Sequence, residues 1–98
     1  MEILKTKTEN TLKLALTGRL DTVTAPELEA VLSDSLEGIE ELILDFTALD
    51  YISSAGLRVL LAAQKRMNTQ GSMKVTNINA DIREVFEITG FCDILTIE

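Results

Sequence analysis

The chain has 98 residues and a net charge of −7, and 46% of its residues are hydrophobic against 26% that are charged. This length suits one domain and this balance suits a folded core, so we expect a single domain over residues 1–98 and exclude a disordered chain. Aromatic residues make up only 4%, which leaves few stacking surfaces for bases, and the negative charge repels phosphate backbones and anionic membranes. The expected partners are therefore proteins, with no nucleic acid and no membrane among them.

Histidine is absent, which excludes Ser-His-Asp and Cys-His catalysis and every zinc site that needs imidazole. The single Cys92 has no partner for an internal disulfide and cannot hold a structural metal by itself, so the chain suits a reducing compartment. No stretch resembles a signal peptide or reaches the ~18–20 apolar residues that span a bilayer. These observations predict a cytoplasmic protein with no cofactor or metal, and they exclude much of ordinary enzyme chemistry.

The first elements form a predicted β-hairpin. In residues 11–17, the side chains of Leu12, Leu14 and Leu16 alternate with polar ones, which is the period of a half-buried strand. Residues 2–8 form a weaker strand, and Glu9-Asn10 between them is a short turn.

A helix is predicted next, beginning near Thr24. Thr24 and Glu27 have the spacing of a capping box, and Pro26 is tolerated in a first turn. Gly38 is the expected left-handed stop. One face carries apolar or small residues at helical spacing, namely Leu28, Val31, Leu32, Ser35 and Leu36.

The rest of the chain alternates between strands and helices. The apolar run at 41–46 predicts a central strand covered on both faces. Residues 54–69 predict a helix that ends at Asn68 to Gly71, with one stripe formed by Leu57, Leu60, Leu61 and Gln64. A strand is expected at 73–77 and a last strand at 93–97. A third helix between them is indicated by Ile82, Val85, Phe86 and Thr89.

This order predicts an α/β fold, in which a mixed, mostly parallel sheet opens with an antiparallel hairpin and has helices packed against it. In such sheets, ligands and functional loops gather at the carboxyl ends of the strands. Two segments lie at such ends, residues 18–21 and 47–54.

Two serines stand at the predicted start of the second long helix, and they have two interpretations. Either Ser53 or Ser54 caps the helix by accepting a hydrogen bond from a first-turn amide, or one of them is a phosphate acceptor. A phosphate there is favoured by the positive end of the helix dipole, so modification need not unfold the helix.

The sequence resembles the STAS-domain anti-sigma factor antagonist (anti-anti-sigma factor) family of bacteria. The resemblance rests on the run Ser53-Ser54-Ala55-Gly56-Leu57 after Leu44-Asp45-Phe46 and Asp50-Tyr51-Ile52, and on Gly18-Arg19-Leu20-Asp21 followed by Thr24-Ala25-Pro26-Glu27-Leu28. It covers essentially the whole chain and implies a single STAS domain.

The resemblance implies a partner-switching regulator and not an enzyme. In that family, the unphosphorylated protein binds an anti-sigma factor that is a serine kinase and thereby frees the sigma factor. Phosphorylation of the serine two residues before the glycine ends binding, and a metal-dependent serine phosphatase resets the switch. That serine is Ser54 here, with Ser53 as the second candidate because it replaces the family's frequent aspartate. The implied partner-binding residues are Asp21, Ser53, Ser54, Ala55 and Gly56.

Asp21 also has a second interpretation, since an aspartate before a helix often serves only to form a turn. Asp45 ends the buried strand and is interpreted as bonding to loop amides, not as a site. Arg58, Lys65 and Arg66 are interpreted as a solvated helix face, and Met67 and Met73 as packing residues.

Two alternatives to the antagonist function stay open at this point. The first is a STAS module that binds a nucleotide weakly, although no phosphate-binding glycine motif occurs. The second is a STAS subunit of a lipid-transport or stress-sensing complex.

Overall fold

The computed structural model describes all residues from Met1 to Glu98. Its elements follow the predicted order, strand-strand-helix-strand-helix-strand-helix, and a short 3₁₀ turn comes after them. They are β1 (Glu2–Thr8), β2 (Thr11–Leu20), α1 (Ala25–Ser35), β3 (Glu41–Ile52), α2 (Ser54–Gln70), β4 (Ser72–Thr76), α3 (Ala80–Thr89) and η1 (Phe91–Asp93). None of the helices is both long and apolar enough to cross a membrane.

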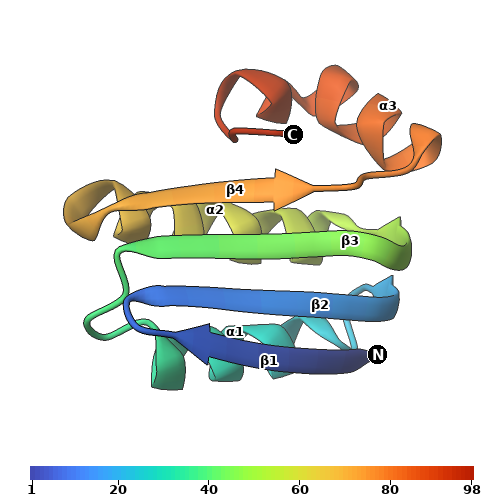
Figure 1. Ribbon diagram of the computed structural model, residues 1–98. Helices are drawn as coiled ribbons and strands as arrows, with labels where there is room; N and C mark the ends of the chain where they lie inside the picture. The colour runs from blue at the N-terminus through green and yellow to red at the C-terminus, as the bar shows by residue number, and fades with distance from the viewer.

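The four strands form one mixed sheet in the order β1-β2-β3-β4. The β1–β2 pair is the predicted antiparallel hairpin, and the other two pairs are parallel. Figure 1 shows α1 and α2 on one face of this sheet and α3 beyond the β4 edge, while no helix lies in front of the other face. The expectation that residues 41–46 are covered on both faces was therefore wrong: Leu42, Leu44 and Phe46 are buried toward the helices, whereas Ile43 is only half-buried on the open face.

β3 is twice as long as the sequence indicated, because it continues through residues 47–52, which were expected to form a loop. Two register shifts in its pairing with β2, between Ala15 and Thr17 and between Gly18 and Arg19, reset the alternation of buried residues. After Phe46 the buried positions are Leu49 and Ile52, a spacing of three that does not match a regular strand. The residues just before the two serines therefore lie in a strand paired with β2 and not in a loop.

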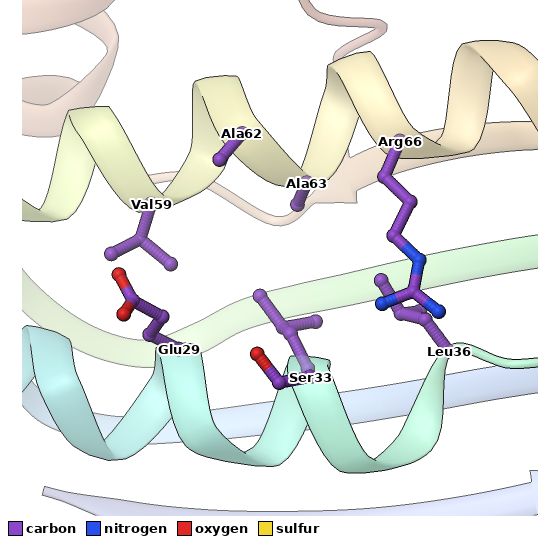
Figure 2. A pocket seen from close by; sticks show the side chains of 8 residues that line it. Glu29, Ser33, Leu36, Val59, Ala62, Ala63 and Arg66 are labelled. Carbon is purple, nitrogen blue, oxygen red and sulfur yellow. The ribbon is translucent and has the colours of Figure 1, made fainter.

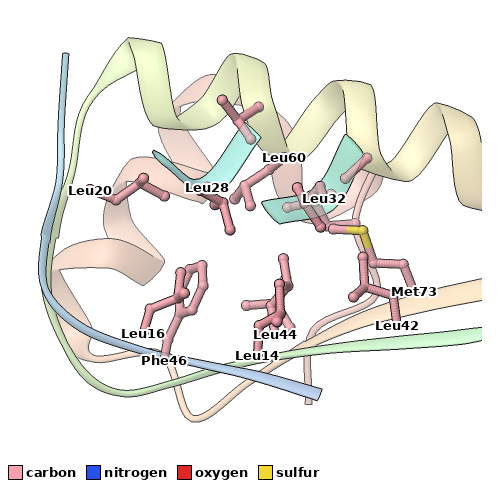
Figure 3. Close-up of a cluster of buried hydrophobic side chains, with 14 of the residues drawn as sticks. Leu14, Leu16, Leu20, Leu28, Leu32, Leu42, Leu44, Phe46, Leu60 and Met73 are labelled. Atoms are coloured by element: carbon pink, nitrogen blue, oxygen red, sulfur yellow. The ribbon is translucent and has the colours of Figure 1, made fainter. Parts of the chain in front are cut away.

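The core is a single cluster of 24 buried hydrophobic residues, nearly all aliphatic, as the composition predicted. Figure 3 shows Leu14, Leu16, Leu44 and Phe46 of the strands facing Leu28, Leu32 and Leu60 of the helices. The predicted helix stripes are confirmed by the burial of Leu28, Leu32, Leu36, Leu57, Leu60, Gln64, Ile82 and Phe86, and Met67 and Met73 are packing residues as expected.

The ends of three elements differ from the prediction. The α1 helix ends at Ser35 with Leu36 as its cap, and Gly38 adopts its positive φ of 79° two residues later, in the turn before β3. Residues 93–97 do not form a strand, because Asp93 belongs to the 3₁₀ turn η1. Only one parallel bridge, between Val75 and Ile97, joins the C-terminal segment to β4.

Candidate functional site

The two segments singled out at the carboxyl ends of the strands lie side by side. In the β2–β3 register, Arg19 is opposite Tyr51 and Leu20 is opposite Ile52. One residue further on, the Ser53 amide donates a hydrogen bond of 2.9 Å to the Leu20 carbonyl. This bond holds the start of α2 against the turn that follows β2. We call the surface formed by Arg19, Asp21, Tyr51, Ser53 and Ser54 the serine rim.

The two serines of the rim have different environments. Ser53 is the N-cap of α2, with extended backbone angles (φ −101°, ψ 175°), and its Oγ accepts a long hydrogen bond of 3.5 Å from the Gly56 amide. Ser54 is the first helical residue, its side chain is exposed, and its hydroxyl makes no hydrogen bond within the chain. The capping interpretation is therefore confirmed for Ser53, and the Ser54 hydroxyl is free for chemistry.

Gly56 lets α2 approach the end of β2 closely. A Cβ atom at this position would lie 2.7 Å from Leu20 Cγ and 2.9 Å from Ile52 Cγ1, closer than carbon atoms can pack. Leu20 and Ile52 are both buried, so neither side chain has space to move away. Residue 56 of the Ser-Ser-Ala-Gly-Leu run must therefore be glycine for a structural reason, because the close approach that it permits sets the position of the two serines before it.

Asp21 organises the turn between β2 and α1. Its Oδ1 accepts hydrogen bonds from the amides of Val23 (3.0 Å) and Thr24 (3.1 Å), and its Oδ2 lies 3.7 Å from the Nε of Arg19. The Thr24 amide is the main cause that lowers the pKa of Asp21 below its usual 3.8, and the Val23 amide, the Thr24 hydroxyl and Arg19 lower it further. The turn-forming interpretation of Asp21 is therefore confirmed, and its carboxylate also forms part of the rim surface.

The predicted capping box at α1 is wrong. Thr24 does occupy the N-cap position, but its side chain makes no capping hydrogen bond. Its hydroxyl instead accepts from the Asp21 amide (2.8 Å) and donates to the Arg19 carbonyl (2.8 Å). Because a threonine hydroxyl can serve either a helix start or a preceding turn, the spacing to Glu27 did not decide between them.

Three exposed residues near the serines and Asp21 were not predicted as parts of a site. The Arg19 guanidinium lies 4.1 Å from the centre of the Tyr51 ring, a cation–π arrangement that holds both side chains at the rim. Val23, whose amide bonds to Asp21, is 80% exposed, which is unusual for a large aliphatic residue. The Arg19–Tyr51 pairing depends on the register shifts of β2 and β3, and no sequence pattern indicates those shifts.

Asp45 lies on the open sheet face and bonds locally, as interpreted from the sequence. Its Oδ1 accepts from the Thr47 hydroxyl (2.6 Å), the Thr47 amide (3.0 Å) and the Asn77 side chain (3.2 Å), and Lys13 is 3.8 Å away. The Thr47 hydroxyl is the main cause that lowers the pKa of Asp45. This carboxylate therefore fixes the middle of β3 and is not part of the serine rim.

A shallow groove separates α1 from α2. Figure 2 shows Glu29 and Ser33 on one side of it and Val59, Ala62, Ala63 and Arg66 on the other. Its volume is about 90 Å³, well below the roughly 300 Å³ of typical small-molecule sites. The groove therefore does not fit a nucleotide.

The chain belongs to the STAS-domain family, because the STAS-domain profile matches residues 2–98. BtrV of Bordetella bronchiseptica, to which anti-sigma factor antagonist function is ascribed, is 37% identical to it over 99 residues, which cover 99% of this chain and 85% of BtrV. The anti-sigma-B factor antagonist of Bacillus subtilis is 31% identical over 90 residues, covering 91% of this chain and 83% of that protein.

Solved structures share the fold. The anti-sigma factor antagonist SpoIIAA in its unphosphorylated form matches with a TM-score of 0.78 at 19% identity, over 99% of this chain and 87% of SpoIIAA. The phosphorylated form of Bacillus SpoIIAA matches with a TM-score of 0.77 at 20% identity, over 99% and 91% of the two chains. In SpoIIAA, this fold is therefore present both with and without phosphorylation.

Proposed function

We propose that this protein is an anti-sigma factor antagonist that works by a phosphorylation-controlled partner switch. Its unphosphorylated form binds an anti-sigma factor of the serine-kinase class through the serine rim, and the sigma factor is released. Asp21, Ser53, Ser54 and Ala55 lie at the contact, and the buried Gly56 sets their position. Phosphorylation of Ser54 by that kinase ends binding, and a metal-dependent phosphatase restores it. The names of the relatives, both at more than 30% identity, support the antagonist function.

The environment of Ser54 is the observation that carries the assignment of the modified residue. Its hydroxyl is exposed and unbonded at the start of a helix, while the neighbouring Ser53 hydroxyl is engaged in the cap. A kinase can therefore reach Ser54 without breaking a hydrogen bond of the fold. In the reaction, the γ-phosphoryl group of ATP moves to Ser54 Oγ, ADP leaves, and the hydroxyl proton passes to a base of the kinase.

The switch acts at the surface in this account. Phosphorylation adds a charge of about −1.5 to −2 to the rim, which already carries the Asp21 carboxylate. A partner that packs against the neutral Ser54 hydroxyl must then desolvate a dianion, which weakens binding without a change of fold.

Mass spectrometry after incubation with the cognate anti-sigma kinase and ATP tests the site. We expect the wild type to gain one phosphoryl group on Ser54 and the variant Ser54→Ala to gain none. Ser53→Ala is the matched control, because it loses the cap hydroxyl and should still be labelled on Ser54. Full labelling of Ser54→Ala, with the phosphate on Ser53, would overturn the assignment.

The direction of the switch follows from two variants of the same residue. Ser54→Asp should bind the anti-sigma factor much more weakly than the wild type, whereas Ser54→Ala should bind and stay active in the presence of kinase and ATP. A carboxylate in the first turn of a helix is favourable by about 0.3–1 kcal/mol, so Ser54→Asp should melt no earlier than the wild type. Calorimetric titration and thermal melting measure the two effects, and loss of the cooperative melting transition in Ser54→Asp would contradict the surface mechanism.

A further inference from the structure

α2 is the only helix that carries basic residues and no acidic ones. They are Arg58, Lys65 and Arg66. Arg58 lies four residues after Ser54, and side chains at this spacing are neighbours on one helix face, with their Cβ atoms roughly 5–6 Å apart. Both side chains are exposed. Ser54 and Arg58 therefore lie one above the other on the surface of α2.

No acidic group of the chain holds Arg58 in place. The three ion pairs of the protein join Lys13 to Asp45, Arg19 to Asp21 and Lys74 to Glu98, and Arg58 makes no side-chain hydrogen bond. It borders an open hollow of about 230 Å³ between the starts of α1 and α2, which Glu29 also lines. The Glu29 carboxylate is not paired with Arg58 either, so the Arg58 guanidinium is available to bind another anion.

We propose that Arg58 binds the phosphate of phosphorylated Ser54 within the same helix. This inference rests on the proposed modification of Ser54. The planar guanidinium donates parallel N–H···O bonds to phosphate oxygens, a charge-assisted pairing that is stronger than one between neutral groups. Phosphorylation then has two effects at the contact surface, since it adds an anion and also withdraws the cation of Arg58 from any partner.

The other nearby cations do not serve this role. Lys65 is 11 residues after Ser54, which is about 16 Å along the helix axis and beyond the reach of a side chain. Arg19 is near the rim, but its guanidinium is stacked on Tyr51 and its Nε faces Asp21. Of the charged groups around the hollow, Glu29 opposes the pairing by repelling the phosphate. Arg58 is therefore the cation that the helix geometry offers to a phosphate at residue 54.

The test uses the full chain with phosphoserine incorporated at residue 54 during translation, so that it needs no kinase. The second ionisation of the phosphate is followed by phosphorus NMR in the wild-type background, in Arg58→Gln and in the matched control Lys65→Gln. Arg58→Gln should move the titration midpoint to higher pH, corresponding to about a twofold gain in the proton affinity of the phosphate. Lys65→Gln should leave the midpoint unchanged, and 1 M salt should reduce the difference. An equal midpoint in Arg58→Gln and the wild type would overturn the proposal.

A second measurement needs no substitution of Arg58. The Nε–H resonance of Arg58 should shift between the unmodified and the phosphoserine protein, and the shift should follow the ionisation of the phosphate. A resonance that does not respond contradicts the pairing even if Arg58→Gln unfolds. If the Arg58 resonance does not respond, the pairing is wrong, but the proposal that the kinase modifies Ser54 is unaffected. If the kinase labels Ser53 instead, the proposed modification site is wrong, but the pairing measured with incorporated phosphoserine is unaffected.

Discussion

Ser53 and Ser54 are identical residues in adjacent positions, yet the start of α2 gives their hydroxyls different tasks. The Ser53 hydroxyl satisfies an amide of the first turn, so its chemistry is tied to the stability of the helix. The Ser54 hydroxyl is exposed and has no structural task. A modification at Ser54 therefore changes only the surface, whereas one at Ser53 would also disturb the cap of α2.

Asp21 has both a structural and a proposed binding task, and asparagine separates them. Asp21→Asn keeps an oxygen that accepts from the Val23 and Thr24 amides and loses the charge. The melting temperature should therefore change little, while affinity for the anti-sigma kinase should fall roughly ten- to a hundredfold through loss of a charge-assisted contact. Calorimetric titration measures this, and wild-type affinity would remove Asp21 from the proposed contact.

Gly56 tests how closely α2 must approach β2. In an open helix, alanine is favoured over glycine by about 1 kcal/mol, but here its Cβ meets the buried Leu20 and Ile52. Gly56→Ala should therefore lower the free energy of unfolding by about 1–3 kcal/mol, as in other overpacked cores. Urea denaturation measures the loss.

A double variant shows whether the contact with Leu20 is the cause. Leu20→Ala removes the two Leu20 atoms that would collide with a Cβ at residue 56 and leaves the contact with Ile52, at the usual cost of a cavity. In the double variant, the loss should be smaller than the sum of the two single losses. Additive losses would mean that Gly56 is required for another reason.

Sequence patterns predicted the start of α2 at residue scale but not the turn before α1. The Ser-Ser run could be placed at a helix start because the apolar stripe after it has helical spacing. The Thr24 hydroxyl could bond either to the first turn of α1 or to the turn before it, and only the folded turn decides which partners it uses.

At the scale of elements, the order of strands and helices was predictable because each has a clear hydrophobic period. The second half of β3 was not, because the register shifts opposite Ala15 and Gly18 change the spacing of its buried residues from two to three. The error matters for the site. Tyr51 was expected in a loop, and the structure fixes it in a strand opposite Arg19.

The connection from α2 to β4 depends on Gly71 for space. A Cβ at this position would overlap the carbonyl oxygen of Glu40, the residue that accepts a hydrogen bond from the Ser72 amide. Because backbone cannot move aside as a flexible side chain can, Gly71→Ala should cost about 3 kcal/mol of unfolding free energy. Chemical denaturation gives the value.

Gly38→Ala is the control for Gly71→Ala. Gly38 has a positive φ of 79° but nothing within 4 Å of the position that a Cβ would take. Its substitution should therefore cost only about 1 kcal/mol, the conformational penalty of a left-handed alanine. Equal costs at the two positions would show that crowding by Glu40 is not what requires Gly71.

At the scale of the whole molecule, charge is unevenly distributed between the helices. The α1 helix carries Glu27, Glu29 and Asp34 without a basic residue, while α2 carries three basic residues without an acidic one. The proposed phosphate would thus enter the one helix with a positive sum, in a protein whose net charge is −7. If the anti-sigma factor contacts the basic residues of α2, its binding should weaken as the salt concentration rises, because exposed charges are screened.

Acid should destabilise the fold in a way that can be traced to Asp45. Its folded-state pKa is lowered from 3.8, mainly by the Thr47 hydroxyl, so the ionised carboxylate stabilises the protein above that pH. This contribution declines as the pH falls through 3.8 and is lost below the folded-state pKa. Thr47→Val removes the hydroxyl and keeps the shape, so the variant should be less stable than the wild type at pH 7 and should approach wild-type stability in acid. Urea denaturation between pH 7 and about pH 3 measures the difference. Thr6→Val on the edge strand is the control, because the Thr6 hydroxyl makes no hydrogen bond, and its stability should differ from that of the wild type by the same amount at every pH. A stability difference for Thr47→Val that does not narrow in acid would show that the Thr47 hydroxyl does not act through Asp45.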